Sequence, residues 1–379
     1  MELINGIEVN EVEKRFVGRA GEKRTPLMGG FELTPYCNLS CKMCLVRESK
    51  PGLPVLTGRQ WLDIGEQAIQ AGTLFGVISG GEPLLHPDFR MIYSGLKKMG
   101  MVITINTNGT LIDENMADFL AADMPRRMNI TLYGPDEQTY QALCVDGQAF
   151  HRVIHAIELL KARNVPIRIN IVPNRINFRG VEGMLAICGR YNLPMEMTTY
   201  MFEPIRKLTP EKQQYRLSPE ERAAAQVMGD AYMLGMNGFL TRKAICYELL
   251  QHHQEPDDPG AKSLVHCQAG LCSYWICWNG KMNACVCMTK PQADVEKMGF
   301  SAAWEETKKE RDGIRVSSKC DGCSLSIFCQ NCAAMSLHEN GDFGQVPRSA
   351  CETTMAYVRM MANGIGKRME RRDEDQEKP

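Results

Sequence analysis

The sequence has no long hydrophobic run, no excess charge of either sign, no internal repeat and no low-complexity tract. No stretch approaches the roughly 18 consecutive apolar residues of a membrane-spanning helix. The first residues, MELINGIEVNEVEKRF, lack the basic flank and apolar core of a secretory signal. Lysine plus arginine (44) nearly balances aspartate plus glutamate (45), so no strong field would attract nucleic acid or an acidic membrane surface. We therefore expect a soluble, cytoplasmic protein with neither a nucleic-acid nor a membrane partner.

Cysteine, in contrast, is abundant, with 16 in 379 residues. Structural disulfides seldom persist in a reducing cytosol, so ligation of a metal or an iron–sulfur cluster is the leading explanation. Three cysteines lie within 37–44 and ten lie between 267 and 351. The other three stand alone, and we expect them to be small buried apolar side chains: Cys144, Cys188 and Cys246.

The middle of the chain predicts an α/β fold. From about residue 29, short β-branched runs alternate with longer amphipathic helical patterns, which is typical of βα units around a parallel sheet. Six such units predict a partial (β/α)6 TIM-like barrel rather than a closed barrel of eight. The six expected strands are 30–35, 74–79, 101–107, 128–133, 166–172 and 194–200.

Changes in composition divide the chain further. Ser218-Pro219-Glu220-Glu221 has the pattern of a helix start, and the proline-rich segment 255–260 that of a linker. The last residues, KRMERRDEDQEKP, carry mixed charge and nothing to bury. We expect an N-terminal extension (1–28), the barrel (29–200), a helical connection with its linker (201–262), a small cysteine-rich domain (263–363) and a charged tail (364–379).

The motif Cys37-Asn-Leu-Ser-Cys41-Lys-Met-Cys44 follows directly on the first expected strand. It therefore lies at the strand's carboxyl end, where barrel enzymes build their sites. Iron–sulfur clusters normally receive four thiolates, so three at tight spacing leave one iron open to a substrate. A zinc site is the alternative, although zinc patterns usually place two close pairs well apart.

CNLSCKMC resembles the hallmark of the radical S-adenosylmethionine (SAM) superfamily, in which three and then two residues separate the cysteines. The resemblance implies that Cys37, Cys41 and Cys44 hold a [4Fe–4S] cluster whose open iron is chelated by the amino and carboxylate groups of SAM. It further implies that reductive cleavage of SAM gives a 5′-deoxyadenosyl radical that abstracts hydrogen. The electron would come from a donor such as flavodoxin or ferredoxin.

Two further segments are candidate SAM contacts. Gly80-Gly81-Glu82-Pro83 follows the second expected strand and resembles the family motif that meets the methionyl amino group. Glycines permit close backbone approach, and a carboxylate accepts from an ammonium. Thr107 and Asn108 end the third strand with groups suited to a ribose or a carboxylate, although Asn-Gly is also a common turn.

From Cys267 onward the spacing resembles the SPASM extension of the superfamily, which carries auxiliary clusters. Twelve residues separate Cys267 from Gly280 and four more precede Cys285; a Cys-x2-Cys-x5-Cys-x2-Cys run then starts at Cys320. The resemblance implies two auxiliary [4Fe–4S] clusters, one held by Cys267, Cys272, Cys285 and Cys332, the other by Cys320, Cys323, Cys329 and Cys351.

Two cysteines of this region, Cys277 and Cys287, are surplus to these ligand sets. Either one replaces Cys272 as a ligand or both remain free thiols. A zinc ribbon is the alternative for the whole region, because Cys-x-x-Cys pairs bind zinc readily.

The function that this resemblance implies is a radical SAM/SPASM enzyme, of oxidoreductase type, that matures a peptide or protein by crosslinking, epimerisation or oxidation. With 36 residues before Cys37, we expect any leader peptide to be recognised by the barrel, the tail or a separate partner. One alternative is a radical SAM enzyme that acts on a small molecule such as a haem precursor. The other is a non-catalytic iron–sulfur scaffold.

Overall fold

The computed structural model describes residues 2–4, 7–9, 11–46, 52–204, 214–257, 260–289 and 292–364. The predicted tail, apart from Gly364, and two residues of the predicted linker lie outside this range. Among the described residues, no helix combines the length and apolarity needed to cross a bilayer.

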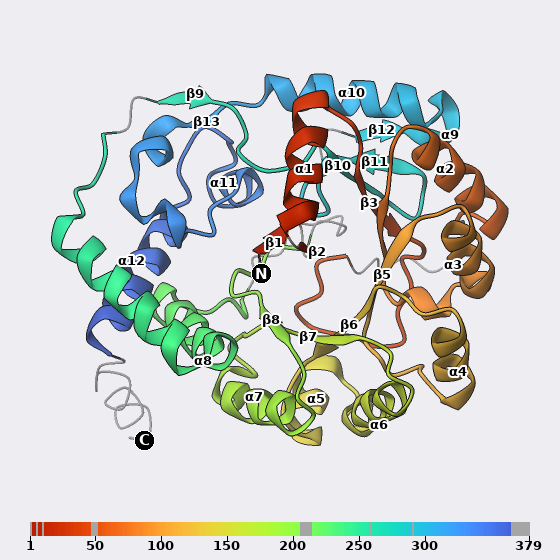
Figure 1. The fold of residues 1–379 in the computed structure, drawn as a ribbon, viewed down its shortest axis with the longest axis horizontal. Coiled ribbons are helices and arrows are strands. Elements are labelled where there is room, and N and C mark those ends of the chain that lie inside the picture. Colours follow the sequence, from red (N-terminus) through yellow and green to blue (C-terminus); the bar gives the residue numbers. More distant parts are fainter. Residues whose placement is uncertain are drawn as a thin grey trace.

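A curved nine-stranded sheet organises the molecule (Figure 1). Six of its strands lie side by side in chain order and are all parallel. They correspond to the six predicted strands, which confirms the α/β partial barrel. They are β3 (Met28–Glu32), β4 (Phe75–Ser79), β5 (Val102–Thr107), β6 (Arg127–Leu132), β7 (Ile167–Ile171) and β8 (Met195–Met197).

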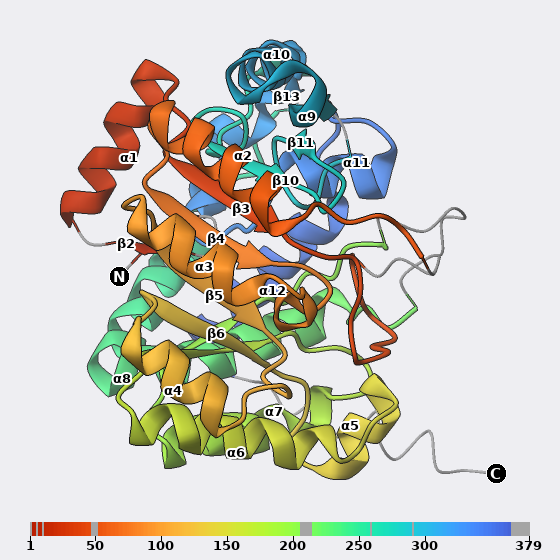
Figure 2. The same ribbon diagram turned by 90° about the vertical axis from the view of Figure 1, so that its right-hand side faces the viewer.

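Helices cover the outer face of this sheet, as Figure 2 shows for the first of them. Strand residues such as Ile105, Ile130 and Ile169 are fully buried in one large core together with apolar side chains of the helices. The helices are α2 (Gly58–Gln70), α3 (Phe89–Lys98), α4 (Glu114–Ala122), α5 (Glu137–Cys144), α6 (Ala149–Ala162) and α7 (Val181–Arg190), with short 3-10 turns at Pro83–Leu85 and Phe178–Gly180.

The inner face of the barrel is polar where the outer face is apolar, because alternate residues of a strand point to opposite sides. The Asn129 side-chain amide donates to Asn106 Oδ1 at 2.8 Å. On the next strands, the Arg168 guanidinium forms a 2.5 Å ion pair with Glu196. Asn106 pairs with Asn129, and Asn129 with Arg168, in the strand registers, so these side chains form one cross-strand row.

The amino-terminal end of the barrel is closed by α1 (Glu11–Lys23), which follows a small hairpin of β1 (Glu2–Ile4) and β2 (Ile7–Val9). Val17 of α1 packs with Met28, Phe75 and Val77 at the start of β3 and β4. The carboxyl ends of the parallel strands, where Cys37 and Gly80 follow β3 and β4, therefore lie at the end of the barrel opposite α1.

The cysteine-rich region extends the same sheet. β10 (Ser273–Ile276) pairs in parallel with β3, and β11 (Lys281–Asn283) and β12 (Gln292–Asp294) continue antiparallel from it. Gly29 and Gly30 are required here, because a Cβ on either would lie within 2.3 Å of the Tyr274 or Trp275 side chain. α9 (Val295–Met298) and α10 (Phe300–Gly313) pack beside these strands (Figure 1).

A second helical layer lies across the molecule from α2 and α3 (Figure 1). α8 (Pro219–His252) begins at Ser218, whose side chain forms a capping box with Glu221 as the sequence predicted, and it kinks at Gly235. It packs along α12 (Arg348–Asn363), with Val227 and Val358 in one apolar cluster. The remaining elements are β9 (Ala261–Ser263), β13 (Val316–Ser317), two 3-10 turns (Ser318–Gly322 and Ser324–Ile327) and α11 (Ala333–Asn340).

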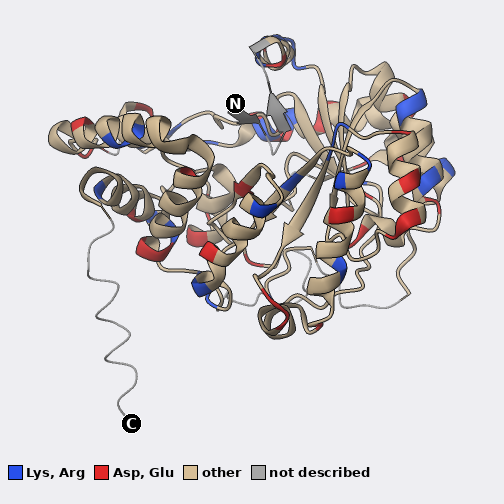
Figure 3. Cartoon of the chain, turned by 60° about the horizontal axis from the view of Figure 1, so that its bottom comes forward, with Lys and Arg blue, Asp and Glu red and all other residues tan. Residues whose placement is uncertain are grey.

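Charged residues are mixed over the surface helices. In the view of Figure 3, lysine and arginine alternate with aspartate and glutamate, in keeping with the near-zero net charge.

Candidate active site

The three cysteines of the CNLSCKMC motif lie on the loop that leaves the carboxyl end of β3. The Ser40 N–H donates to the Cys144 carbonyl at 3.2 Å, and the Lys42 N–H donates to the Leu143 carbonyl at 3.0 Å. The cysteine loop is therefore fastened to the end of α5, across the barrel mouth from β3. Cys41 is buried, whereas Cys37 and Cys44 are partly exposed.

The segment after β5 holds the other side of the loop. The Asn108 side-chain amide donates to Asn38 Oδ1 at 2.9 Å and lies 3.6 Å from the Cys37 sulfur. The Asn38 amide in turn donates to the Thr110 hydroxyl at 2.7 Å. Amides that point at a cluster thiolate orient it and tune its potential, so Asn38 and Asn108 are suited to support Cys37. No local pattern predicts the Asn38 contacts, because their partners are about 70 residues away along the chain.

Gly80 and Gly81 bring the second loop against the first. The Gly81 N–H donates to the Thr34 carbonyl at 2.7 Å, and the Glu82 N–H donates to the Tyr36 carbonyl at 2.8 Å. A Cβ on Gly81 would lie 2.3 Å from the Tyr36 carbonyl oxygen, and one on Gly80 would lie 2.8 Å from the Thr34 carbonyl oxygen. Both neighbours are backbone atoms of the segment between β3 and Cys37, so glycine is required for this close approach.

Glu82 is fully buried, and its carboxylate accepts three hydrogen bonds from the protein. The donors are the Thr107 hydroxyl at 2.8 Å, the Asn108 N–H at 2.7 Å and the Leu84 N–H at 3.1 Å. Burial raises the pKa of Glu82 to about 7, although these hydrogen bonds oppose the shift. The carboxylate thus joins the loops after β4 and β5, and Pro83 opens the short turn that follows it. This role was not apparent from the sequence.

The structure therefore brings all the candidate SAM contacts next to the cysteine loop. Gly80, Gly81 and Glu82 face the residues before Cys37, and Thr107 and Asn108 are tied to Glu82.

The thiols of the motif are close enough to influence one another. Burial raises the pKa of Cys37 to about 12, and the Leu39 N–H, which donates to its sulfur at 3.4 Å, opposes this shift. Smaller upward contributions come from the negative charges of Glu82, Cys41 and Cys44. A hydrogen bond with the Cys144 thiol and burial together raise the pKa of Cys41. Three thiols on one short loop are the donor type that an iron–sulfur cluster requires, and bound iron would compensate the charge of the thiolates.

Cys144 has a contact that the sequence did not predict. Like Cys188 and Cys246 it is buried, as expected of an isolated cysteine. Its thiol also lies against that of Cys41, at a separation of about 100 residues along the chain. The Tyr133 side chain completes the contact by hydrogen bonding to the Cys41 sulfur.

The cysteines of the C-terminal region form two groups. In the first, burial and the nearby charges of Cys285 and Cys267 raise the pKa of Cys332, and all three cysteines pack on Val265 and Ala333. In the second, burial and the nearby charges of Cys329, Cys320 and Cys323 raise the pKa of Cys351. Asn331 lies between the two groups, and its amide donates to the Cys320 sulfur at 3.3 Å.

Both groups border open space. The four thiols of the second group line a cavity of about 1280 Å³. A smaller cavity of about 130 Å³ is bordered by Cys267 and Cys332 of the first group and Cys320 of the second. Within the described ranges, no three His, Cys, Asp or Glu side chains converge as the ligands of a single metal ion.

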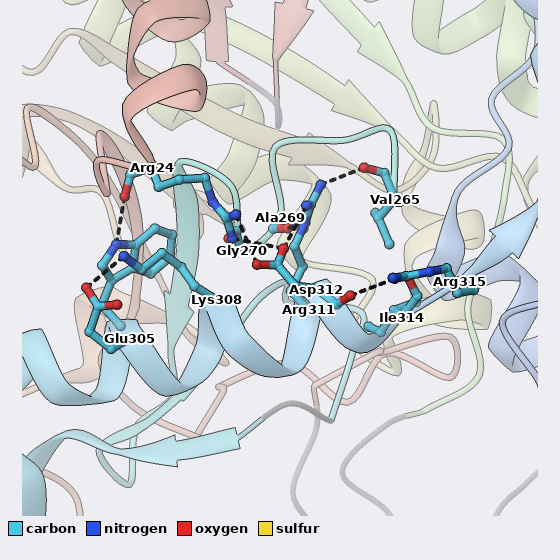
Figure 4. Close-up of polar contacts among 11 residues, drawn as sticks. Arg24, Val265, Ala269, Gly270, Glu305, Lys308, Arg311, Asp312, Ile314 and Arg315 are labelled. Atoms are coloured by element: carbon cyan, nitrogen blue, oxygen red, sulfur yellow. Dashed lines mark hydrogen bonds and ion pairs between the residues drawn. The ribbon is translucent and has the colours of Figure 1, made fainter. Parts of the chain in front are cut away.

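A buried arginine braces the loop that carries Cys267 (Figure 4). Arg311 of α10 donates to the Val265 carbonyl at 2.6 Å and to the Ala269 carbonyl at 3.3 Å, on both sides of Cys267. Arg24, at the end of α1, forms a 3.0 Å ion pair with Asp312 beside it. The barrel and the cysteine-rich region are thus linked at the base of the first thiol group. No local pattern in the sequence marks Arg311 for this role.

Comparison with known proteins agrees with this geometry. Residues 31–183 match the profile of the radical SAM superfamily. The chain is 22% identical over 335 residues to the "AdoMet-dependent heme synthase" of Methanosarcina barkeri, covering 84% of this chain and 94% of that protein. It is 29% identical over 174 residues to the "Mycofactocin maturase MftC" of Mycobacterium ulcerans, covering 46% of this chain and 47% of that protein.

A solved structure shares the fold. It is described as native anSMEcpe with bound AdoMet and Kp18Cys peptide, and it superposes with a TM-score of 0.66 at 17% identity, covering 90% of this chain and all of that one. The radical SAM family uses a [4Fe–4S] cluster and SAM. The family match shows that residues 31–183 form a radical SAM domain, and the chain is similar in sequence to proteins named as a heme synthase and as a maturase.

Proposed function

We propose that Cys37, Cys41 and Cys44 hold a [4Fe–4S] cluster with one open iron, and that SAM binds there. The observation that carries this proposal is the placement of the three thiols on one loop at the carboxyl end of β3, packed against Gly80, Gly81 and Glu82. When bound, the cluster and SAM supply a 5′-deoxyadenosyl radical able to abstract hydrogen. The electron comes from a donor such as flavodoxin or ferredoxin.

The chain's own residues position these groups. The Glu82 carboxylate holds the loop after β4 against the loop after β5 through its hydrogen bonds with Thr107 and Asn108. The Asn108 side-chain amide in turn contacts the Cys37 sulfur. Gly80 and Gly81 leave no side chain between the two loops, so their backbone can lie along the methionyl part of SAM. Thr107 and Pro83 are the remaining residues that we propose to line the SAM site. Preorganised loops of this kind lower the cost of holding a cofactor in one orientation.

We further propose that the two C-terminal thiol groups hold auxiliary [4Fe–4S] clusters. Cys320, Cys323, Cys329 and Cys351 form one ligand set, because all four line one cavity, and burial and the charges of the other three raise the pKa of Cys351. Cys267, Cys285 and Cys332 belong to the other set. These clusters form the core of the predicted SPASM domain at 263–363, although its β10 to β12 share a sheet with the barrel.

The substrate that we propose is a peptide or protein. MftC is named a maturase, and the anSMEcpe structure holds a peptide. The polar inner row of Asn106, Asn129, Arg168 and Glu196 supplies hydrogen-bonding groups inside the barrel. Peptide backbones carry donors and acceptors that such a row can meet.

A haem precursor is the second candidate substrate. The match to the M. barkeri heme synthase favours it, because it covers 84% of this chain and 94% of that protein. A guanidinium such as that of Arg168 also suits a carboxylate of a small molecule.

The test is anaerobic incubation of the iron-replete protein with SAM and a reductant. Formation of 5′-deoxyadenosine that is lost in Cys37→Ala supports the enzyme; its absence in iron-replete protein supports the scaffold alternative. Adding candidate peptides or haem precursors, and reading their mass changes, then separates the two substrate classes.

A further inference from the structure

The first group of C-terminal thiols contains a cysteine that the family spacing does not assign. Cys287 lies two residues after Cys285 in a tight turn, where the Met288 N–H donates to the Cys285 carbonyl at 3.1 Å. The Cys287 N–H points at the Cys285 sulfur at 3.4 Å. The two thiols are hydrogen bonded to each other, and this bond lowers the pKa of Cys285.

Cys287 also faces the rest of the group. A hydrogen bond with Cys285, burial and the nearby charges of Cys285 and Cys332 hold the pKa of Cys287 well above its usual range. Four cysteines pack against the same apolar side chains, which include Val265, Met288 and Ala333; they are Cys267, Cys285, Cys287 and Cys332. The Cys287 carbonyl accepts from the His338 ring of α11 at 3.2 Å, which ties this turn to the helix that follows Cys332.

Cys272, the fourth ligand implied by the family spacing, lies elsewhere. It immediately precedes β10, and because β10 runs parallel to β3, Cys272 is at the amino-terminal end of the sheet. Its side chain is fully buried in the apolar cluster beneath α1, together with Val17, Met28 and Phe75. Its sulfur is 2.9 Å from the Gln268 side-chain oxygen and 3.9 Å from the Val17 carbonyl.

Burial raises the pKa of Cys272, and the charge of Cys267 adds to this shift, so the two thiols are near enough to interact. This proximity follows from the short turn between them, in which the Cys272 N–H donates to the Gln268 carbonyl. The packing is the stronger criterion, since a cluster ligand must direct its sulfur toward the other ligands. Cys277, the other surplus cysteine, is buried in the hairpin of β10 and β11, where the Asn283 amide donates to its sulfur at 3.0 Å.

We propose that Cys287, and not Cys272, completes the ligand set of the first auxiliary cluster with Cys267, Cys285 and Cys332. The inference rests on the proposed auxiliary cluster and names its fourth ligand. On ligation each thiol releases its proton and its sulfur binds one iron, so four thiolates close a four-iron cluster. Cys272 then remains a core thiol that helps α1 to close the barrel.

The experiment measures iron, acid-labile sulfide and electron paramagnetic resonance (EPR) spectra of the full chain, reconstituted anaerobically. Cys287→Ala should lose about four irons per chain, or about one if a three-iron cluster with an oxidised-state EPR signal remains. Cys272→Ala and Cys277→Ala, as matched controls, should keep the wild-type iron content and spectra. Cys287→Asp, which retains a ligating oxygen, should keep more iron than Cys287→Ala and shift the spectrum of the reduced cluster.

The outcomes separate this inference from the proposed function. If Cys267→Ala and Cys332→Ala leave the iron content unchanged, the auxiliary cluster itself is absent and both proposals fail. If those two variants lose iron while Cys272→Ala also loses it and Cys287→Ala does not, the cluster stands and the assignment of Cys287 is wrong. Retention of all iron in both Cys272→Ala and Cys287→Ala overturns the assignment as well. A circular dichroism melt of each variant shows whether lost iron reflects lost folding.

Discussion

Replacing Glu82 by glutamine tests whether the carboxyl at the candidate SAM site is buried and titrates at a raised pKa. Glu82 is fully buried, and its pKa is raised from 4.5 to about 7. Each pKa unit corresponds to about 1.4 kcal/mol, so this pKa shift changes the free energy of unfolding by about 3 kcal/mol between low and high pH.

The sign follows from proton binding. Below pH 4.5 the carboxyl holds its proton in both states, whereas between 4.5 and about 7 the folded chain keeps a proton that the unfolded chain has lost. The stabilising contribution is therefore complete at low pH and is lost as the pH rises through about 7. The wild-type apoprotein should lose about 3 kcal/mol of unfolding free energy over this range relative to Glu82→Gln.

Urea unfolding of the anaerobic, reduced apoprotein, followed by circular dichroism from pH 4.5 to 8, measures this difference. The control is Glu182→Gln, which removes an exposed carboxyl of α7. Its stability curve should run parallel to that of the wild type. If the curves of Glu82→Gln and wild type are also parallel, the burial of a titrating Glu82 is refuted.

Three further changes test other parts of the structure. Gly81→Ala should separate the two loops, because its Cβ would lie 2.3 Å from the Tyr36 carbonyl oxygen, and should reduce iron retention at the Cys37 site several-fold. Iron content after gel filtration measures this, and retention equal to wild type would contradict the close approach. Arg311→Leu should destabilise the apoprotein by about 2 kcal/mol or more in urea unfolding, since two buried carbonyls beside Cys267 lose their donor, and an unchanged midpoint would contradict this. Ser218→Ala should cost about 1 kcal/mol through loss of the α8 capping box, whereas Thr241→Ala, on an exposed part of the same helix, should cost less.

The sequence was sufficient to predict the six parallel strands and the position of the cysteine motif, because both follow from local patterns. Alternation of β-branched runs with helical patterns marks β3 to β8, and the order of the units requires that Cys37 and Gly80 lie at the same end of the sheet.

Such local patterns do not predict contacts between segments that are far apart in the sequence. Nothing near Glu82 indicates that Thr107 and Asn108 occupy its carboxylate, and nothing near Cys41 points to Cys144. The parallel pairing of β10 with β3 joins segments about 245 residues apart, which local propensity does not encode. The family spacing placed Cys272 with Cys267, but packing of α1 decides where the Cys272 side chain lies.

The measurement that tests the central claim most directly is the formation of 5′-deoxyadenosine by the anaerobic, iron-replete protein supplied with SAM and dithionite, set beside Cys37→Ala, Cys41→Ala and Cys44→Ala. A radical SAM site on the loop after β3 predicts product from the wild type and none above background from any of the three variants. Iron-replete wild type that leaves SAM intact, or a Cys37→Ala variant that cleaves it at the wild-type rate, would contradict the account.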